Sequence, residues 1–212
     1  VLKAAQAISS SLELDQLIAS LTRIILENSG AKKAVLMLPQ DNAWQVKAIT
    51  LICQQEIQTT LVPQLLDNSP DIPIHIIHYV KNTKQTVLIN NCKTNVPGLI
   101  GKYMLEYQPQ SVLCIPMINQ GNLVGILYLE NNLTPGVFTS EGLQVINLLS
   151  SQAAISLENA QLYAQQQEKN RQISQKEEEY RSIFESVNDG LDIRDVETGK
   201  LVAANPTIYQ IY

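Results

Sequence analysis

Residues 111–131 read SVLCIPMINQGNLVGILYLEN, and this stretch decides the fold. Two runs rich in Val, Ile and Leu, Ser111 to Ile118 and Leu123 to Leu129, flank the short segment 119–122. Such runs, bounded by turn residues, are typical of buried strands. Gly121 lies in the short segment and can adopt the positive φ that a tight hairpin turn requires. The stretch therefore predicts an antiparallel hairpin, whose strands we expect to be the central strands of a sheet.

A long helix is expected after this hairpin. Thr139 is a good N-cap, and Phe138 and Leu143 occupy the N′ and N4 positions of a hydrophobic staple. Apolar residues are dense up to about Ala160, whereas residues 161–179 are rich in Gln, Lys and Glu and contain neither Gly nor Pro. We therefore expect a helix that first packs on the sheet and then continues in water.

The first half of the chain supplies a further helix and a further hairpin. Between Leu14 and Ile25 apolar residues recur every three or four positions, and Gly30 follows as a helix stop, so an amphipathic helix should end near residue 28. The runs 33–38 and 43–52 are rich in β-forming residues and are separated by a turn that begins at a proline. They predict a hairpin.

The middle of the chain gives weaker signals. Residues 53–73 are polar and contain three prolines, so we expect a variable loop there, with at most a strand at 56–61. Residues 74–107 predict two short helices, near 74–80 and 99–106, with a short strand between them. The whole pattern indicates an α+β fold. It combines a central antiparallel sheet of about five or six strands, helices on its faces and a long C-terminal helix.

Charge and cysteine content exclude several classes of function. The net charge is −5 and the 15 Lys and Arg residues are scattered, which argues against nucleic acid as a partner. No apolar run reaches the 18 residues of a membrane span, so no membrane partner is expected. Three cysteines without metal-ligand spacing are typical of reduced thiols, which favours a cytoplasmic location. Because the chain begins without Met and stops within an apolar run, we expect it to be a piece of a larger protein.

The exposed helix carries a polar heptad pattern. One seam is formed by Gln166, Ile173, Tyr180 and Val187, and the companion seam by Leu162, Lys169, Lys176 and Ile183. The pattern predicts a weak coiled coil and hence a homodimer. The alternative is a single helix that is stabilised by (i, i+4) pairs along its surface.

The order of elements, together with four segments, resembles the GAF domain family. The segments are SVLCIPM at 111–117, NLVGILYLEN at 122–131, Phe138-Thr139 and LSSQAAISLENA at 149–160. The last three are similar to GAF domains of large cyanobacterial-type sensor histidine kinases that are hybrids with serine/threonine kinases. The resemblance implies a non-catalytic sensory module of a two-component system. Such a module binds a small ligand or a partner and relays the signal through a dimerising helix.

A second resemblance concerns the end of the chain. Residues 178–190, followed by Thr198-Gly-Lys and Ala204-Asn-Pro206, are similar to the N-terminal third of a PAS domain. The resulting division is a GAF domain at 1–160, a signalling helix at 161–179 and a truncated PAS domain at 180–212. Because a PAS domain needs about 100 residues, this last part is too short to form its complete sheet.

Kinase catalysis within this chain is not expected. There is no phosphoacceptor His-Glu pattern, and the nine glycines form neither GxGxxG nor a P-loop. His75 and His78 could share a metal with Cys92, but ordinary surface or partly buried histidines are the preferred interpretation. No cofactor is therefore identified from these residues.

Two cofactors known in the family are disfavoured. Phytochrome-like GAF domains hold a bilin through a Cys of the cap helix, whereas residues 98–107 contain no Cys. Cyclic-nucleotide-binding GAF domains carry a signature that Asn132, Phe138 and Glu141 match only in part, because its Lys is missing. The staple at the start of the long helix already explains Phe138.

A small ligand of this family would lie between the sheet and the cap formed by residues 74–107. The candidates to line that pocket are Tyr79, Asn91, Tyr103, Met104, Tyr107 and Cys114. Tyr103, Met104 and Tyr107 could equally be the packing face of the cap helix. Two other functions remain open. One is a thiol-dependent methionine sulfoxide reductase using Cys92 and Cys114, and the other is a ligand-free dimer spacer.

Overall fold

The computed structural model describes the backbone of residues 2–40, 43–91, 98 and 101–211, and within this set the side chains from residue 14 to residue 209. Two compact units are present, and each is described separately. The first is Ala5–Leu162, and the second comprises residues 1–4 and 163–212. The elements in chain order are α1 (Leu2–Ser29), β1 (Lys33–Gln40), β2 (Ala43–Cys53), β3 (Glu56–Leu65), the 3₁₀-helix η1 (Leu66–Asn68), α2 (Ile74–Thr83), β4 (Val87–Ile89), α3 (Lys102–Tyr107), β5 (Ser111–Asn119), β6 (Asn122–Asn131), α4 (Ser140–Ser186), β7 (Asp192–Arg194), β8 (Leu201–Ala204) and α5 (Ile208–Ile211).

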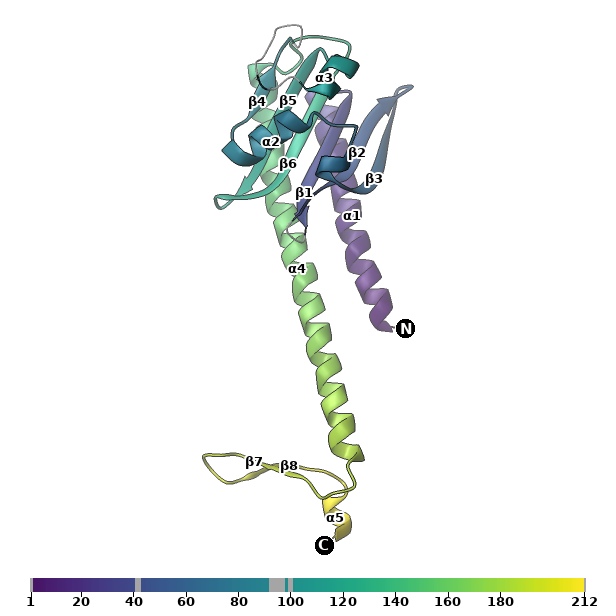
Figure 1. Cartoon of the computed structure of the whole chain (residues 1–212), viewed down its shortest axis with the longest axis vertical. Helices are drawn as coiled ribbons and strands as arrows, with labels where there is room; N and C mark the ends of the chain where they lie inside the picture. The colour runs from purple at the N-terminus through teal and green to yellow at the C-terminus, as the bar shows by residue number, and fades with distance from the viewer. Residues whose placement is uncertain (1, 41–42, 92–97, 99–100, 212) are drawn as a thin grey trace. The chain divides into compact units, whose positions relative to one another are not determined.

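The first unit is built on a six-stranded antiparallel sheet in the order β3-β2-β1-β6-β5-β4 (Figure 1). Both predicted hairpins form, as β1–β2 and β5–β6. The prediction that β5 and β6 are the central strands is wrong for β5, because β1 and β6 form the middle pair and β5 has only β4 beyond it. The pairing of β1 with β6 joins segments far apart in the chain, which the local pattern of either hairpin cannot reveal.

The segment expected to be a variable loop, with at most a strand at 56–61, contains a longer strand than expected. β3 extends over residues 56–65 and includes Pro63, and η1 follows it at once. Proline fits here because β3 lies at the edge of the sheet and because the register with β2 shifts between Val46 and Ala48. The three prolines of residues 53–73 therefore do not prevent a strand from forming, because the proline within β3 lies in an edge strand.

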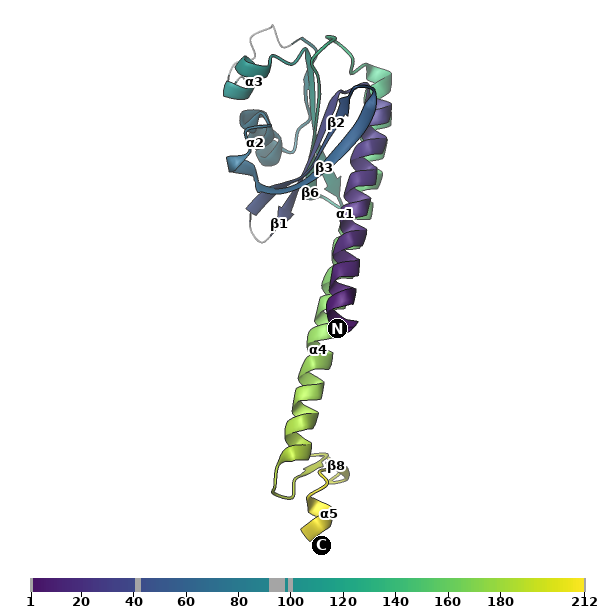
Figure 2. The ribbon, with the colours of Figure 1, turned by 90° about the vertical axis from the view of Figure 1, so that its right-hand side faces the viewer.

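Helices cover both faces of the sheet, with α1 and α4 on one face and α2 and α3 on the other (Figure 2). Side chains alternate along each strand and so contribute to two separate cores. The helix-side cluster lies against α1 and α4 and includes Ile18, Leu36, Leu127, Phe138 and Leu157. The cap-side cluster lies against α2 and α3 and includes Val35, Ile76, Met104, Cys114 and Tyr128. The expected cap thus forms.

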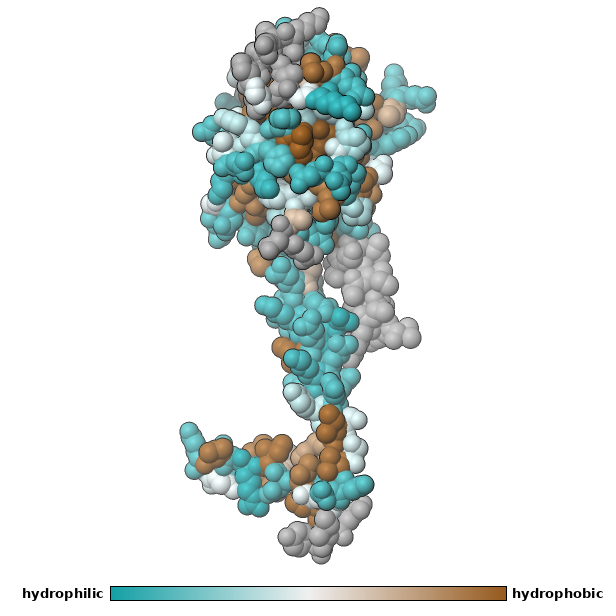
Figure 3. Space-filling view, viewed as in Figure 1, coloured by the Kyte–Doolittle hydropathy of each residue, from teal (hydrophilic) through white to brown (hydrophobic). Residues whose placement is uncertain are grey.

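The start and continuation of the long helix are confirmed. The hydroxyl oxygen of Thr139 accepts a hydrogen bond from the backbone N–H of Gly142 at 3.2 Å, which is an N-cap interaction. α4 then comprises 47 residues, of which the first part belongs to this unit. Its face toward the sheet carries small residues such as Ala153 and Ala154, both fully buried, which allow a close approach to the strands. In residues 163–186 of α4, which belong to the second unit, most side chains are polar and exposed (Figure 3).

The second unit contains the end of α4, the hairpin β7–β8 and α5. Asn205 is fully buried and organises this unit, because its Oδ1 accepts from the N–H of Leu191 at 2.8 Å and its Nδ2 donates to the carbonyl of Asp189 at 2.9 Å. Asp195 closes the hairpin turn by accepting from the N–H of Thr198 at 2.7 Å. β7 and β8 therefore form a two-stranded antiparallel hairpin in this unit.

Candidate ligand site between the sheet and the cap

Three of the six predicted pocket residues lie together in the cap-side core. Tyr103 and Met104 are the buried residues of α3, and Cys114 is fully buried in β5. All three belong to the cap-side cluster. In this structure the space between sheet and cap is therefore filled by side chains of the protein itself.

The other three predicted pocket residues are exposed. Asn91 lies at the surface and has interactions of its own. The hydroxyl of Tyr79 donates to Oε1 of Gln85 at 3.2 Å, so its polar end is turned away from the core. Tyr107 is half exposed, and its ring stacks on that of Tyr103 with a centroid distance of 4.6 Å. Of these three, Tyr107 contacts the buried group through its ring.

A buried polar network lies under Tyr103, and the sequence interpretation did not identify it. The hydroxyl of Tyr103 donates to the Glu130 carboxylate at 2.8–2.9 Å, and Tyr128 donates to the same carboxylate at 2.6 Å. Nζ of Lys33 donates to the Tyr103 hydroxyl at 2.8 Å and to the carbonyl of Asp71 at 2.6 Å. The Tyr103 hydroxyl thus accepts from an ammonium group and donates to a carboxylate at the same time.

The sheet register explains how these residues meet. Lys33 of β1 and Glu130 of β6 are directly opposite one another in the antiparallel ladder. Residues two positions apart on a strand share a face, so Glu130 lies on the same face as Tyr128, and Lys33 on that of Val35. α3 then places Tyr103 above the pair, and the Lys33 ammonium lies 5.0 Å from the centre of its ring.

Burial shifts the pKa of three members of this network, Lys33, Tyr103 and Tyr128. Desolvation lowers the pKa of Lys33, although the charges of Glu130 and Asp71 oppose that shift. Desolvation and the neighbouring Glu130 carboxylate raise the pKa of both Tyr103 and Tyr128 well above the usual range. Both phenols therefore stay protonated at neutral pH and act as hydrogen-bond donors.

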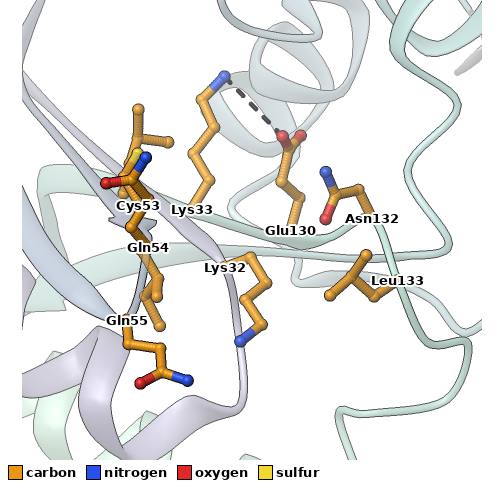
Figure 4. Close-up of a pocket in the computed structure, with 10 residues that line it drawn as sticks. Lys32, Lys33, Cys53, Gln54, Gln55, Glu130, Asn132 and Leu133 are labelled. Carbon is orange, nitrogen blue, oxygen red and sulfur yellow. Dashed lines mark ion pairs between the residues drawn. The ribbon is translucent and has the colours of Figure 1, made fainter.

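Two hollows border the network. One, of about 500 Å³, lies beside the Lys33–Glu130 pair and is also lined by the β2–β3 turn and by Asn132. Figure 4 shows the Lys33 and Glu130 side chains pointing toward each other, while Lys32 extends in the opposite direction. The second, of about 340 Å³, lies between α3 and residues 67–75 and includes Tyr103 and Tyr107 in its wall. The Tyr103 side chain therefore connects a hollow on the surface with the buried ion pair.

The cysteines do not form a reactive pair in the part of the chain that the structure describes. Cys114 is fully buried, and this burial raises the pKa of its thiol above the usual range. A thiol in that state is a poor nucleophile, because the thiolate is the reactive form. Cys53 is exposed, and Cys92 lies outside the described residues.

We therefore expect Cys114 to be unreactive in the folded protein. In a Cys92→Ser variant, a chromogenic disulfide reagent should titrate Cys53 rapidly and Cys114 at least about 100-fold more slowly, because modification of Cys114 requires opening of the core. Unfolding in urea should release the second thiol. Equal rates for both thiols under native conditions would contradict the burial of Cys114.

The two histidines lie in different environments. Nε2 of His78 lies 3.1 Å from the carboxylate of Asp67 on the surface. His75 packs against Gly101, where an added Cβ would come within 2.5 Å of the ring. Within the described residues no group of three or more His, Cys, Asp or Glu side chains is placed to hold a metal ion. The third ligand of the metal hypothesis, Cys92, is outside that set.

Two histidine kinases are similar in sequence to parts of this chain. A hybrid signal transduction histidine kinase G from Dictyostelium discoideum is 42% identical over 97 residues, which cover 46% of this chain and 3% of that protein. The peroxide stress-activated histidine kinase mak3 from Schizosaccharomyces pombe is 26% identical over 164 residues, 77% of this chain and 7% of that protein. This chain therefore spans only a small part of both curated relatives.

Structural comparison and a family model both point to the GAF domain. A crystal structure of a GAF domain/HD domain protein from Geobacter sulfurreducens superposes with a TM-score of 0.54 at 17% identity, covering 70% of this chain and 94% of that chain. Among the described helices none combines the length and the apolarity that a membrane span requires. The GAF domain model matches residues 13–157, more than half of the chain. This chain belongs to the GAF domain family.

Proposed function

We propose that this chain is a sensory and regulatory GAF module of a histidine kinase, which relays a signal through α4 as a dimerising helix. Both curated relatives are histidine kinases, and the GAF match covers the first unit. In this proposal the parent protein is a cytoplasmic kinase of the large hybrid type, and kinase chemistry resides outside this chain. A coupling of roughly 1–3 kcal/mol between the cap and the helix would suffice for such regulation.

The observation that carries the proposal is an apolar seam along α4. Seven of its exposed apolar residues follow one heptad phase, with exposed fractions between 39% and 70%, whereas Tyr163, also exposed, lies outside that phase. They are Val145, Leu148, Ile155, Leu162, Ile173, Tyr180 and Ile183. The sequence interpretation drew the seam only from Leu162 onward. The burial of the opposite helix face, at Ile146, Ala153 and Leu157, leaves this seam free for a partner helix.

Polar residues interrupt the seam, so the proposed coiled coil is a weak one. Gln166 bonds within its own helix to Asn170 at 3.0 Å, and Glu168 forms two hydrogen bonds with Arg171. Such local pairs would also support an unpaired helix, although each contributes only a few tenths of a kcal/mol. A marginal interface suits a relay, because a small input can change its register or strength.

Sedimentation equilibrium of the chain tests this proposal. Wild type should sediment as a dimer, twice the 23.6 kDa of one chain. Replacing Ile173 and Ile183 together by Asp should weaken the dimer at least about tenfold, because each substitution buries a charge in the seam. Gln175→Asp with Ser182→Asp adds the same charge on the outer face and is the matched control. A monomeric wild type, or equal masses for both double variants, would refute pairing along this seam.

The C-terminal unit is proposed to be the beginning of a PAS domain. The turn closed by Asp195 and the buried Asn205 support it, since both stabilise the short β7–β8 hairpin. In the parent kinase this hairpin would be the first part of a larger sheet. α4 would then lead directly from the sensory domain into the next one.

The filled cap-side core favours a second candidate, a ligand-free dimer spacer. Tyr103, Met104 and Cys114 occupy the region that a ligand of this family would use. The thiol reductase alternative has no such support, because the buried Cys114 thiol is unsuited to attack. Calorimetric titration with p-cresol separates a spacer from a ligand-responsive module.

A further inference from the structure

The Tyr103 side chain is held in the way that a protein holds a bound phenol. Its hydroxyl lies between the Lys33 ammonium at 2.8 Å and the Glu130 carboxylate at 2.8–2.9 Å. Its ring stacks on that of Tyr107 at a centroid distance of 4.6 Å and forms a T-shaped pair with that of Tyr128 at 6.5 Å. Charged groups contact its polar end, and aromatic side chains contact its ring.

The polar end of this arrangement selects a hydroxyl group. Nζ of Lys33 and the nearest oxygen of Glu130 are 3.9 Å apart, which is too long for a hydrogen bond. A single atom between them must therefore accept from the ammonium and donate to the carboxylate. A carbonyl oxygen cannot donate and an ammonium cannot accept, whereas a hydroxyl does both.

The ring environment selects an aromatic body. The ring of Tyr128, in a T-shaped arrangement with that of Tyr103, belongs to β6 and would remain in place when α3 is released; such a neighbour favours an aromatic π-system over an aliphatic chain. The adjoining hollow of about 340 Å³ also exceeds the roughly 150 Å³ that suffices for benzene in a protein core. A one-ring compound has room beside α3.

The helix that carries Tyr103 is weakly held. α3 has only six residues, and among the described residues its N-terminus has no side-chain cap. Leu105 and Tyr107 of the same helix are largely or half exposed. Tyr103 and Met104 are thus its main anchors to the core, and a compound that replaces the Tyr103 phenol would release α3 from the sheet.

We propose that the cap-side site binds a small hydroxyaromatic compound, whose hydroxyl takes the place of the Tyr103 hydroxyl between Lys33 and Glu130. Tyr103 is then a resident competitor, and ligand binding exchanges one phenol for another while freeing α3. This inference rests on the proposed regulatory function, because the release of α3 would be the input to α4. The compound would enter a site that the Tyr103 side chain fills when no ligand is bound.

Calorimetric titration of the whole chain with p-cresol tests the inference. Toluene lacks the hydroxyl and 4-methylcyclohexanol lacks the aromatic ring, so both should bind at least about tenfold more weakly. Tyr103→Phe removes the competing hydroxyl and should raise the affinity for p-cresol about tenfold, corresponding to about 1.4 kcal/mol. Tyr79→Phe removes a hydroxyl from the other cap helix and should leave the affinity unchanged.

The outcomes separate the two proposals. Absence of p-cresol binding to both wild type and Tyr103→Phe overturns the ligand inference, as does equal binding of toluene or 4-methylcyclohexanol. An equal gain from Tyr79→Phe also overturns it, because the gain would then not arise at the Lys33–Glu130 pair. If binding fails while the chain still sediments as a seam-dependent dimer, the relay proposal stands and the spacer is favoured. If binding succeeds in a monomeric chain, the dimeric relay fails instead.

Discussion

Replacing Glu130 by Ala is expected to lower the free energy of unfolding by about 3–5 kcal/mol, as for one partner removed from a buried ion pair. The Glu130 side chain is only 11% exposed and the Lys33 side chain 12%, so the ammonium would lose its countercharge in a region with little water. The phenols of Tyr103 and Tyr128 would lose their acceptor as well. Urea denaturation, followed by circular dichroism, measures the change.

Two comparisons show whether the charge pair causes this loss. Glu106→Ala removes an exposed carboxylate from α3 and should change stability by less than about 0.5 kcal/mol. The double variant Lys33→Met, Glu130→Gln removes both charges but retains an acceptor for the phenols. It should be more stable than Glu130→Ala, because no unpaired charge remains. A loss below about 1 kcal/mol for Glu130→Ala would contradict a buried, interdependent network.

Local signals were sufficient to predict much of the fold. Gly121 marks a turn by its backbone freedom, and its φ of +82° agrees with that expectation. Thr139 marks a helix start by its hydroxyl, and the bond to the Gly142 N–H forms. Such features depend on residues close together in the chain. Strand order depends on contacts between distant segments, and for that reason β1 was not recognised as a partner of β6.

Around the buried network, sequence reasoning named residues of the cap helix but not the charged residues of the two paired strands. Tyr103 and Met104 were found because they lie on the cap helix, but Lys33 and Glu130 were missed because their meaning depends on the β1–β6 register. One signal was present in the sequence. Ile126, Tyr128 and Glu130 alternate along one strand, which places the carboxylate on the same face as two apolar side chains. A charge on an inward face indicates a buried partner.

Phe138→Ala is expected to cost about 3–5 kcal/mol, as for other buried phenylalanines truncated to alanine. Phe138 is only 2% exposed and belongs to the helix-side cluster, where it lies just before the first turn of α4. Truncation would leave a cavity in this cluster, against which Leu143 also packs. Phe138→Leu, which retains most of the volume, should cost less than half as much.

The same variant decides between two interpretations of Phe138. As part of a cyclic-nucleotide signature it would contact a ligand under the cap, and its loss would alter binding more than stability. Phe138 instead packs in the cluster on the α1 and α4 side of the sheet, whereas the cap covers the other side (Figure 2). We therefore expect Phe138→Ala to lower the urea midpoint strongly, with Leu133→Ala, an exposed neighbour, as the near-neutral control. Unchanged stability of Phe138→Ala would contradict its burial in the helix-side cluster.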